Sequence, residues 1–131
     1  MLAEETREGL LASFWQALSH PLRIKVLEYL RNDGALNVGE LVQRLQIGQG
    51  HLSNHLACLK NCGLVVAEVR GRFVYYRIRD PRVVQLLDLG SAILQDHLDG
   101  VASCRIVHPS ARPLGKTEVA SSAEGFSARQ S

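Results

Sequence analysis

Apolar residues recur at intervals of three and four along most of the first hundred residues, which is the spacing of one face of an α-helix. The pattern predicts five helices: residues 4–18, from Pro21 to a stop at Gly34, a short segment after Asn37, residues 49–62, and residues 81–98. Two runs rich in Val and Tyr, residues 64–69 and 73–78, are typical of β-strands. The chain is therefore predicted to be mainly α-helical with one β-hairpin.

Residues that favour caps and turns separate these segments. Ser19 is expected to cap the second helix, and Asn37 and Glu40 have the spacing of a capping box at the start of the third. Residues 47–50 form a predicted tight turn, and Asp80 is expected to cap the last helix. A short helix, a glycine-containing turn, a second helix and a hairpin follow one another in the order of a winged helix-turn-helix.

The positive charge is concentrated in the segment that carries this motif. The whole chain has a net charge of +2, but residues 41–82 hold 7 basic and 2 acidic side chains, a net of +5. Residues 1–40 and 83–131 carry nets of −2 and −1. A basic module between slightly acidic flanks favours the binding of a polyanion such as DNA.

The fourth predicted helix has two faces of different chemistry. Leu52, Leu56 and Leu59 share an inward face, while small and amide-bearing side chains on the opposite face suit close approach to the major groove. Basic residues of the helix and the hairpin would contact phosphates. The candidate DNA-binding residues are Gln49, Gly50, His51, Ser53, Asn54, Lys60, Arg70 and Arg72. The alternatives are an ordinary solvated surface and a winged helix that binds a protein and has no role at DNA.

Three cysteines form a second constellation, and their odd number favours reduced thiols over a disulfide framework. Cys58 and Cys62 are four residues apart on one predicted helix, with their β-carbons about 5–6 Å apart, and Cys104 follows the last helix. Three thiolates favour a soft ion, namely Cd(II), Pb(II), Hg(II), As(III) or Sb(III), and tolerate Zn(II). A fourth ligand could come from His51, His55 or His108. Simple packing of the cysteines and sensing of oxidants by their thiols stay open as alternatives.

The length fits one folded domain over residues 1–108. Residues 109–131 are expected to form a disordered tail, because 13 of these 23 residues are Ser, Ala, Gly or Pro. The sequence has neither a membrane-spanning apolar run nor a secretory signal, so a cytoplasmic location is expected. It also has no nucleophile motif, phosphate loop or paired-acid pattern, so an enzyme is not expected.

Three stretches carry a family resemblance. Residues 17–24 read ALSHPLRI, residues 52–59 read LSNHLACL, and residues 70–76 read RGRFVYY. In this order they resemble the ArsR/SmtB family of metal-responsive winged-helix repressors, over about residues 8–100. Within that family, the run CLKNC from Cys58 to Cys62, followed by Cys104, is similar to the CmtR-like cadmium/lead sensors.

The resemblance implies a homodimer that binds double-stranded operator DNA and is released when Cd(II) or Pb(II) binds Cys58, Cys62 and Cys104, the last donated by the other subunit. It also implies a dimer interface on the first and last helices, for which we expect Leu11, Phe14, Trp15, Leu87, Ile93 and Leu94. Neither the Cys-x-Cys motif of arsenite sensors nor the paired Asp/His sites of zinc sensors is present. A repressor that senses arsenite, antimonite or mercury, and a redox-sensing repressor, are the alternatives with the same fold.

Overall fold

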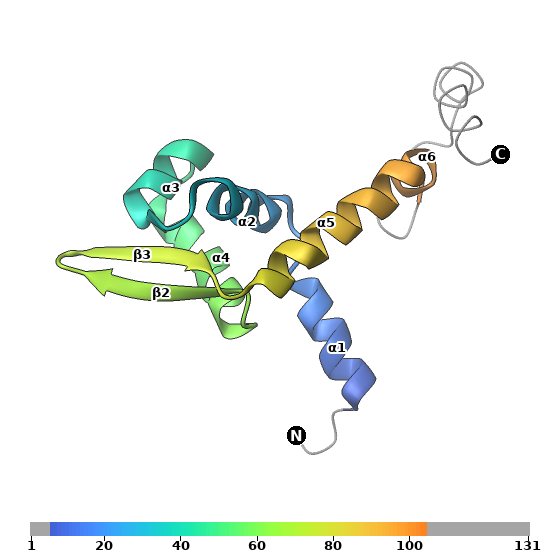
Figure 1. Ribbon diagram of the computed structural model, residues 1–131, viewed down its shortest axis with the longest axis horizontal. Helices are drawn as coiled ribbons and strands as arrows, with labels where there is room; N and C mark the ends of the chain where they lie inside the picture. Colours follow the sequence, from blue (N-terminus) through green and yellow to red (C-terminus); the bar gives the residue numbers. More distant parts are fainter. Residues whose placement is uncertain (1–5, 105–131) are drawn as a thin grey trace. The chain divides into compact units, whose positions relative to one another are not determined.

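The structure is a computed structural model that describes residues 6–104. The chain divides into two compact units, residues 1–84 and 85–131, and each is described by itself. The first holds α1 (Arg7–Gln16), α2 (Pro21–Asp33), β1 (Leu36–Asn37), α3 (Val38–Leu45), α4 (Gln49–Asn61), β2 (Val65–Arg70) and β3 (Phe73–Ile78) (Figure 1). The helix α5 (Pro81–Asp96) continues into the second, which also contains α6 (Leu98–Ala102).

The connection between α1 and α2 differs from the expectation. The N-cap of α2 is His20, whose Nδ1 accepts a hydrogen bond from the Leu22 backbone N–H at 3.1 Å. Ser19 does not cap: its hydroxyl donates to the Gln16 carbonyl at 2.8 Å, at the end of α1. The prediction for Ser19 was wrong because the imidazole of the next residue stands directly before Pro21 and takes the acceptor role.

The expected capping box at the start of α3 is confirmed. The Asn37 side chain accepts from the Glu40 backbone N–H at 2.8 Å, and the Glu40 carboxylate accepts from the Asn37 N–H at 2.8 Å. The turn that follows comprises residues 46–48 rather than 47–50, because α4 already begins at Gln49. Its left-handed residue is Gln46, with φ 56°, so the chain reverses before the first glycine of the turn.

The predicted hairpin is part of a three-stranded antiparallel sheet with the order β1-β3-β2. Strand β1 was not predicted, because two residues are too short to show an alternating pattern; Leu36 pairs with Tyr76 and Asn37 with Tyr75. Arg70 pairs with Phe73, so Arg70 belongs to β2 and the loop is only Gly71 and Arg72. Gly71 has φ 64° while Arg72 has no positive φ, a combination that suits a type II′ turn.

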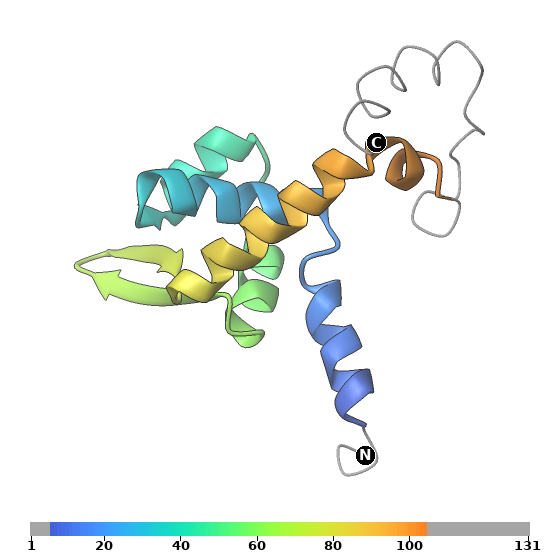
Figure 2. The same cartoon turned by 45° about the vertical axis from the view of Figure 1, so that its right-hand side comes forward.

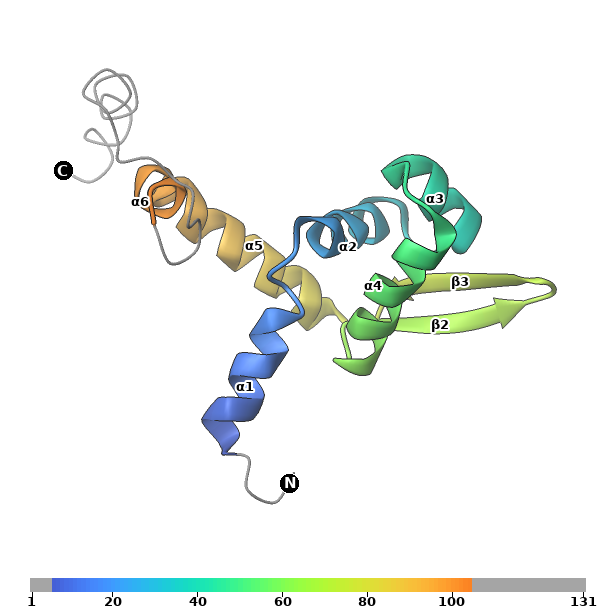
Figure 3. The same cartoon turned by 180° about the vertical axis from the view of Figure 1, so that it is seen from behind.

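The core of the first unit is made mainly of leucine. Six leucines of α2, α3 and α4 are 0–2% exposed, as are Val26 and Val65; these leucines are Leu27, Leu30, Leu41, Leu52, Leu56 and Leu59. Figure 3 shows α4 running from the end of α3 to the base of β2, and Figures 1 and 2 show the hairpin extending from the side of the α2–α3–α4 bundle. This order of helix, turn, helix and wing confirms the predicted fold class.

The helix α5 starts as expected, since the Asp80 carboxylate accepts from the Arg82 backbone N–H at 2.8 Å. It ends at Asp96, two residues earlier than predicted, and the short α6 was not foreseen. The predicted tail over residues 109–131 and its boundary at residue 108 lie outside the described residues. Between residues 6 and 104, no helix is long and apolar enough to cross a membrane.

Candidate DNA interface and thiol pair

The helix α4 presents the two faces that the sequence predicts. Leu52, Leu56 and Leu59 are at most 1% exposed and face the core. The exposed positions carry polar or small side chains, and they include the candidate DNA-binding residues Gln49, Gly50, His51, Ser53, Asn54 and Lys60. One face of the helix is therefore an exposed polar surface, and the opposite face packs its leucines into the core.

The first turn of α4 is open to an anion. Its N-cap is Gly48, which makes no side-chain cap hydrogen bond, and the first turn contains no acidic residue. Backbone N–H groups at a helix start are not satisfied within the helix, and the helix dipole favours negative charge there. A phosphate group is a suitable partner for such a terminus.

In the wing, Arg70 is held by its neighbours. It donates to the Glu68 carboxylate at 3.1 Å and lies over the Tyr75 ring, 4.8 Å from its centroid. Arg77 approaches the same carboxylate at 3.5 Å. These arginines, above all the hydrogen bond from Arg70, hold the pKa of Glu68 below its ordinary value. The charge of Arg70 is thus partly neutralised before any phosphate is present.

Arg72 and Lys60 are in a different position. Arg72 lies at the hairpin tip, 5.8 Å from the centroid of the Phe73 ring, and is exposed. Within residues 6–104, neither Arg72 nor Lys60 forms a salt bridge. Their charges are therefore more available to a nucleic-acid backbone than the charge of Arg70.

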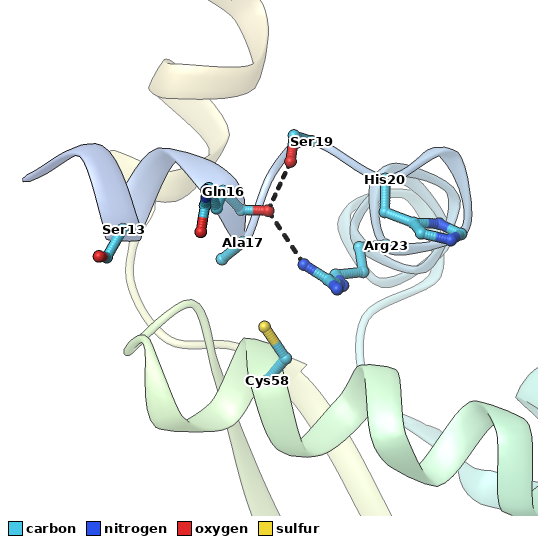
Figure 4. Close-up of a pocket in the computed structure, with 7 residues that line it drawn as sticks. All are labelled: Ser13, Gln16, Ala17, Ser19, His20, Arg23 and Cys58. Atoms are coloured by element: carbon cyan, nitrogen blue, oxygen red, sulfur yellow. Dashed lines mark hydrogen bonds between the residues drawn. The ribbon is translucent and has the colours of Figure 1, made fainter.

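Cys58 points from α4 into a cavity of about 430 Å³ between α1, α2 and α4 (Figure 4). The cavity is polar, and Arg23 is the lining residue with a permanent positive charge. The other lining residues are Ser13, Gln16, Ala17, Ser19 and His20. A thiol in such surroundings is accessible, and its thiolate would have a cation beside it.

Cys62 is the C-cap of α4 and is partly buried, like Cys58. Burial raises the pKa of the Cys62 thiol, and the charge of Cys58 and a hydrogen bond with it raise this pKa further, while Arg23 acts in the opposite direction. The two thiols are therefore close neighbours, as their spacing predicts, and Cys62 holds its proton more firmly than a free cysteine does.

Cys104 belongs to the second unit and is partly buried there. Across residues 6–104, the structure contains no group of three or more His, Cys, Asp or Glu side chains placed to hold a metal ion. One chain thus brings together Cys58 and Cys62, and the three-thiol site stays a prediction. His108, one of the fourth-ligand candidates, lies outside the described residues.

A cluster of histidines beside the thiols was not recognised as a unit from the sequence. His55 is only 7% exposed, and its ring lies 4.4 Å from the ring of His20 and 5.0 Å from that of His51. Burial, and then the charges of His20, Arg23 and His51, lower the pKa of His55. The spacing of His51 and His55 was visible in the sequence, but no local pattern points to partners from α2.

Comparison with known proteins places this geometry in a family. A family model described as "Bacterial regulatory protein, arsR family" matches residues 20–66, which cover α2 to the start of β2. The transcriptional regulator CmtR of Mycobacterium tuberculosis is 41% identical over 87 residues, which are 66% of this chain and 73% of CmtR. The chain belongs to the ArsR family.

Two further ArsR-type relatives add detail. A probable mercury resistance operon repressor of Streptomyces lividans is 33% identical over 99 residues, 76% of this chain and 78% of that repressor. The solution structure of a homodimeric winged helix-turn-helix DNA-binding domain from Mycobacterium bovis has a TM-score of 0.64 and 28% identity, and covers 72% of this chain and 91% of that one. These relatives are transcriptional regulators and DNA-binding domains, not enzymes.

The candidate dimer residues of this ArsR-family chain differ in exposure. Leu11 and Trp15 of α1 are 40% and 46% exposed, and Ile93 and Leu94 of α5 are 63% and 41% exposed. Phe14 is partly buried, and Leu87 is 8% exposed in the single chain, so Leu87 has little surface to offer. The assignment of these residues to a dimer interface stays a prediction.

Proposed function

We propose that this chain is a homodimeric cytoplasmic repressor that binds double-stranded operator DNA through α4 and the wing and is released when a soft metal ion binds Cys58, Cys62 and Cys104. One observation carries the proposal: Cys58 lies within, and Cys62 caps, the same helix that presents an exposed polar face suited to base edges. A metal held by these thiols would therefore act directly on the element that contacts DNA.

The DNA-binding half of the proposal is supported by shape and charge. The exposed face of α4 carries Ser53 and Asn54, and an asparagine can bond adenine in two places. The open first turn of α4, together with Lys60 and Arg72, supplies contacts for phosphates. A two-fold dimer places two such helices on half-sites one DNA turn apart or a multiple of it.

The metal half is supported by the donor chemistry. Two neighbouring sulfurs on one helical turn suit soft ions, for which thiolate ligands are strongly preferred. Cys58, Cys62 and Cys104 would hold such an ion, which would supply a strong bond to each sulfur. The chain's own contribution is to present two thiols from a rigid helix and a third, Cys104, from beyond α5, with the partner subunit as its proposed source.

Burial of the Cys62 thiol favours a metal ion over an oxidant as the effector at this sulfur. Oxidants attack thiolates, so redox-sensing cysteines have a lowered pKa and are well exposed. The pKa of Cys62 is raised instead, because the thiol is partly buried and lies beside Cys58. A metal ion can displace that proton by forming a strong bond to sulfur, whereas peroxide depends on thiolate that is already present.

A titration of DNA binding against a panel of ions tests the proposal. Duplex DNA from the region upstream of the protein's own gene is bound at several salt concentrations, and Cd(II), Pb(II), Zn(II), As(III), Sb(III) and Hg(II) are then added while ultraviolet thiolate-to-metal absorption is recorded. We expect steeply salt-dependent binding and release by Cd(II) or Pb(II), with absorption rising in parallel. Release by As(III), Sb(III) or Hg(II) alone would change the assigned ion. Release by peroxide with metal chelated, or weak binding that salt does not affect, would contradict the proposal.

A further inference from the structure

A chain of hydrogen bonds connects the end of α1 to the DNA-facing end of α4. Arg23 of α2 donates through Nη1 to the Gln16 carbonyl at 3.0 Å and through Nε to Nδ1 of His55 at 3.1 Å. On α4, Nε2 of His55 lies 3.3 Å from Nε2 of His51. The side chain of His51 is exposed and stands among the residues that we assign to DNA contact.

In this series of hydrogen bonds, the donor and the acceptor of each bond can be assigned. The Nε of an arginine can only donate, so Nδ1 of His55 accepts and the single proton of a neutral His55 ring sits on Nε2. That proton points at Nε2 of His51, which must accept and therefore carries its own proton on Nδ1. The contacts thus assign a tautomer to both rings, and burial, which lowers the pKa of His55, favours its neutral ring.

The same direction argues against His55 as a metal ligand. A metal ion on Nε2 of His55 would move the ring proton to Nδ1, where it would meet the N–H of Arg23. The described part of the chain also holds no cluster of three ligands at this place. His55 is therefore better suited to hold α4 in position than to bind an ion.

Arg23 also belongs to the surroundings of the thiols. It lines the cavity into which Cys58 points, and its charge acts on Cys62 (Figure 4). Thiolates that hold a metal ion carry negative charge, and Arg23 is the permanently charged residue that faces them across the cavity. Nε and Nη1 of the planar guanidinium hold His55 and Gln16, so a turn of this group toward the sulfurs would strain these two bonds.

We propose that Arg23, His55 and His51 form a relay that positions α4 for DNA and transmits occupation of the thiol site to His51. This inference rests on the function proposed above and names the residues that couple its two sites. With the thiol site empty, Arg23 donates a hydrogen bond to His55, and His55 donates one to His51. When the sulfurs hold a metal ion, Arg23 turns toward them, His55 loses its donor, and His51 is no longer fixed. None of the three relay residues is itself a metal ligand.

Nitrogen NMR of the histidine rings tests the resting relay without any metal. In the metal-free protein, we expect His55 to be the tautomer protonated on Nε2 and His51 the tautomer protonated on Nδ1. Addition of Cd(II) should shift the ring nitrogens of both residues without giving either the signature of a metal-bound nitrogen. A proton on Nδ1 of His55 in the metal-free protein, or direct coordination of Cd(II) by either ring, would overturn the relay.

Three variants test the coupling. His55→Leu removes the relay, Arg23→Lys keeps the positive charge but cannot make both bonds of the fork, and His55→Gln keeps an acceptor for Arg23 and a donor for His51. The measured quantity is the factor by which Cd(II) lowers operator affinity. In His55→Leu and Arg23→Lys, we expect this factor to be about threefold or less. In His55→Gln it should stay within about threefold of the wild type. The Cd(II) affinity of free His55→Gln should change by less than about threefold, because this variant keeps the thiols, Arg23 and both hydrogen bonds of the relay.

The outcomes separate this inference from the proposed function. If the wild type responds to Cd(II) and folded Arg23→Lys or His55→Leu responds as strongly, the relay is wrong and the proposed function stands. If His55→Gln loses the response as fully as His55→Leu, the direction of the hydrogen bonds does not matter and the relay is again contradicted. If the wild type itself does not respond to any ion of the panel, the proposed function fails, and the relay as a coupling device fails with it.

Discussion

The helices α4 and α5 are similar in length, with 13 and 16 residues, but they expose different surfaces. The exposed positions of α4 are polar or small, and its large apolar residues are buried. On α5, Leu89 and Ile93 are 64% and 63% exposed. An exposed polar face on a basic module suits a charged and hydrated partner such as DNA, while exposed leucine and isoleucine are suited to a protein partner.

The comparison assigns the two proposed interactions to different parts of the chain. Substitutions on α5 should act on assembly, and through assembly on DNA. Substitutions on the polar face of α4 should act on DNA alone. The following predictions test this division, from the largest expected effect to the smallest.

The largest effect is expected from Ile93→Asp, which places a charge on the apolar surface of α5. We expect the dimer to dissociate and operator affinity to fall by about 100-fold or more, because a monomer loses the avidity of two linked half-sites. Sedimentation velocity gives the mass, and fluorescence anisotropy gives the affinity. Gln95→Asp, at an exposed polar position of the same helix, is the matched control. A stable dimer with unchanged affinity in Ile93→Asp would place the interface elsewhere.

Asn54→Ala should weaken binding to the cognate operator by about 5- to 150-fold, the equivalent of 1–3 kcal/mol for a bidentate base contact. Non-specific DNA should be bound nearly as before, so the ratio between the two affinities reports the loss of base reading. Asn61→Ala, an exposed asparagine in the last position of α4, serves as control and should change little. An equal loss in both variants would mean that α4 lies on DNA in another orientation.

Arg72→Ala should lower operator affinity by several-fold and reduce the dependence of log K on log salt by about 0.9 for each phosphate that the variant no longer neutralises. Arg70→Ala should have a smaller effect on that slope, because Arg70 is already paired with Glu68 and covers Tyr75. Affinities measured over a range of salt concentrations compare the two directly. A larger change of slope for Arg70→Ala would show that its salt bridge opens on DNA.

The smallest effect concerns stability and pH. The pKa of His55 is lowered from its ordinary value of 6.5 in the folded protein. Below about pH 6.5, His55 is therefore protonated more readily in the unfolded chain than in the folded chain. The stability due to the neutral ring is therefore complete above that pH and is lost as the pH falls toward the folded-state pKa. In urea unfolding, the free energy of unfolding should be lower at about pH 5.5 than at about pH 7.5, and this difference should be smaller in His55→Gln than in the wild type. The same decrease in both proteins would remove His55 as its cause.

The sequence predicts the fold well where a local pattern determines the structure. The leucine spacing of α4, the capping box of Asn37 and Glu40, and the two strands of the wing are each specified by neighbouring residues. The sequence does not predict structure that depends on contacts between distant segments. Strand β1 exists because Leu36 and Asn37 pair with Tyr76 and Tyr75, about forty residues away.

The candidate site shows the same limit. The two thiols could be placed on one helical turn from their spacing alone, and the exposed face of α4 could be identified from a helical projection. The bond between Arg23 and His55 joins residues that are 32 positions apart, and no periodicity predicts it. The sequence predicts that His55 belongs to the helix of residues 49–62, but the burial of His55 depends on how α2 packs against that helix.

The most direct test of the central claim is the reciprocity between metal and DNA. The Cd(II) affinity is measured for the free protein and for the operator complex, and the operator affinity is measured with and without Cd(II). If the thiols of α4 couple the two sites, Cd(II) should bind the free protein about tenfold more tightly or better, and operator affinity should fall by the same factor. In Cys58→Ser/Cys62→Ser, operator binding should stay intact and both ratios should be close to one. Equal Cd(II) affinity in the free wild type and its complex, or an unchanged response in the double variant, would contradict the account.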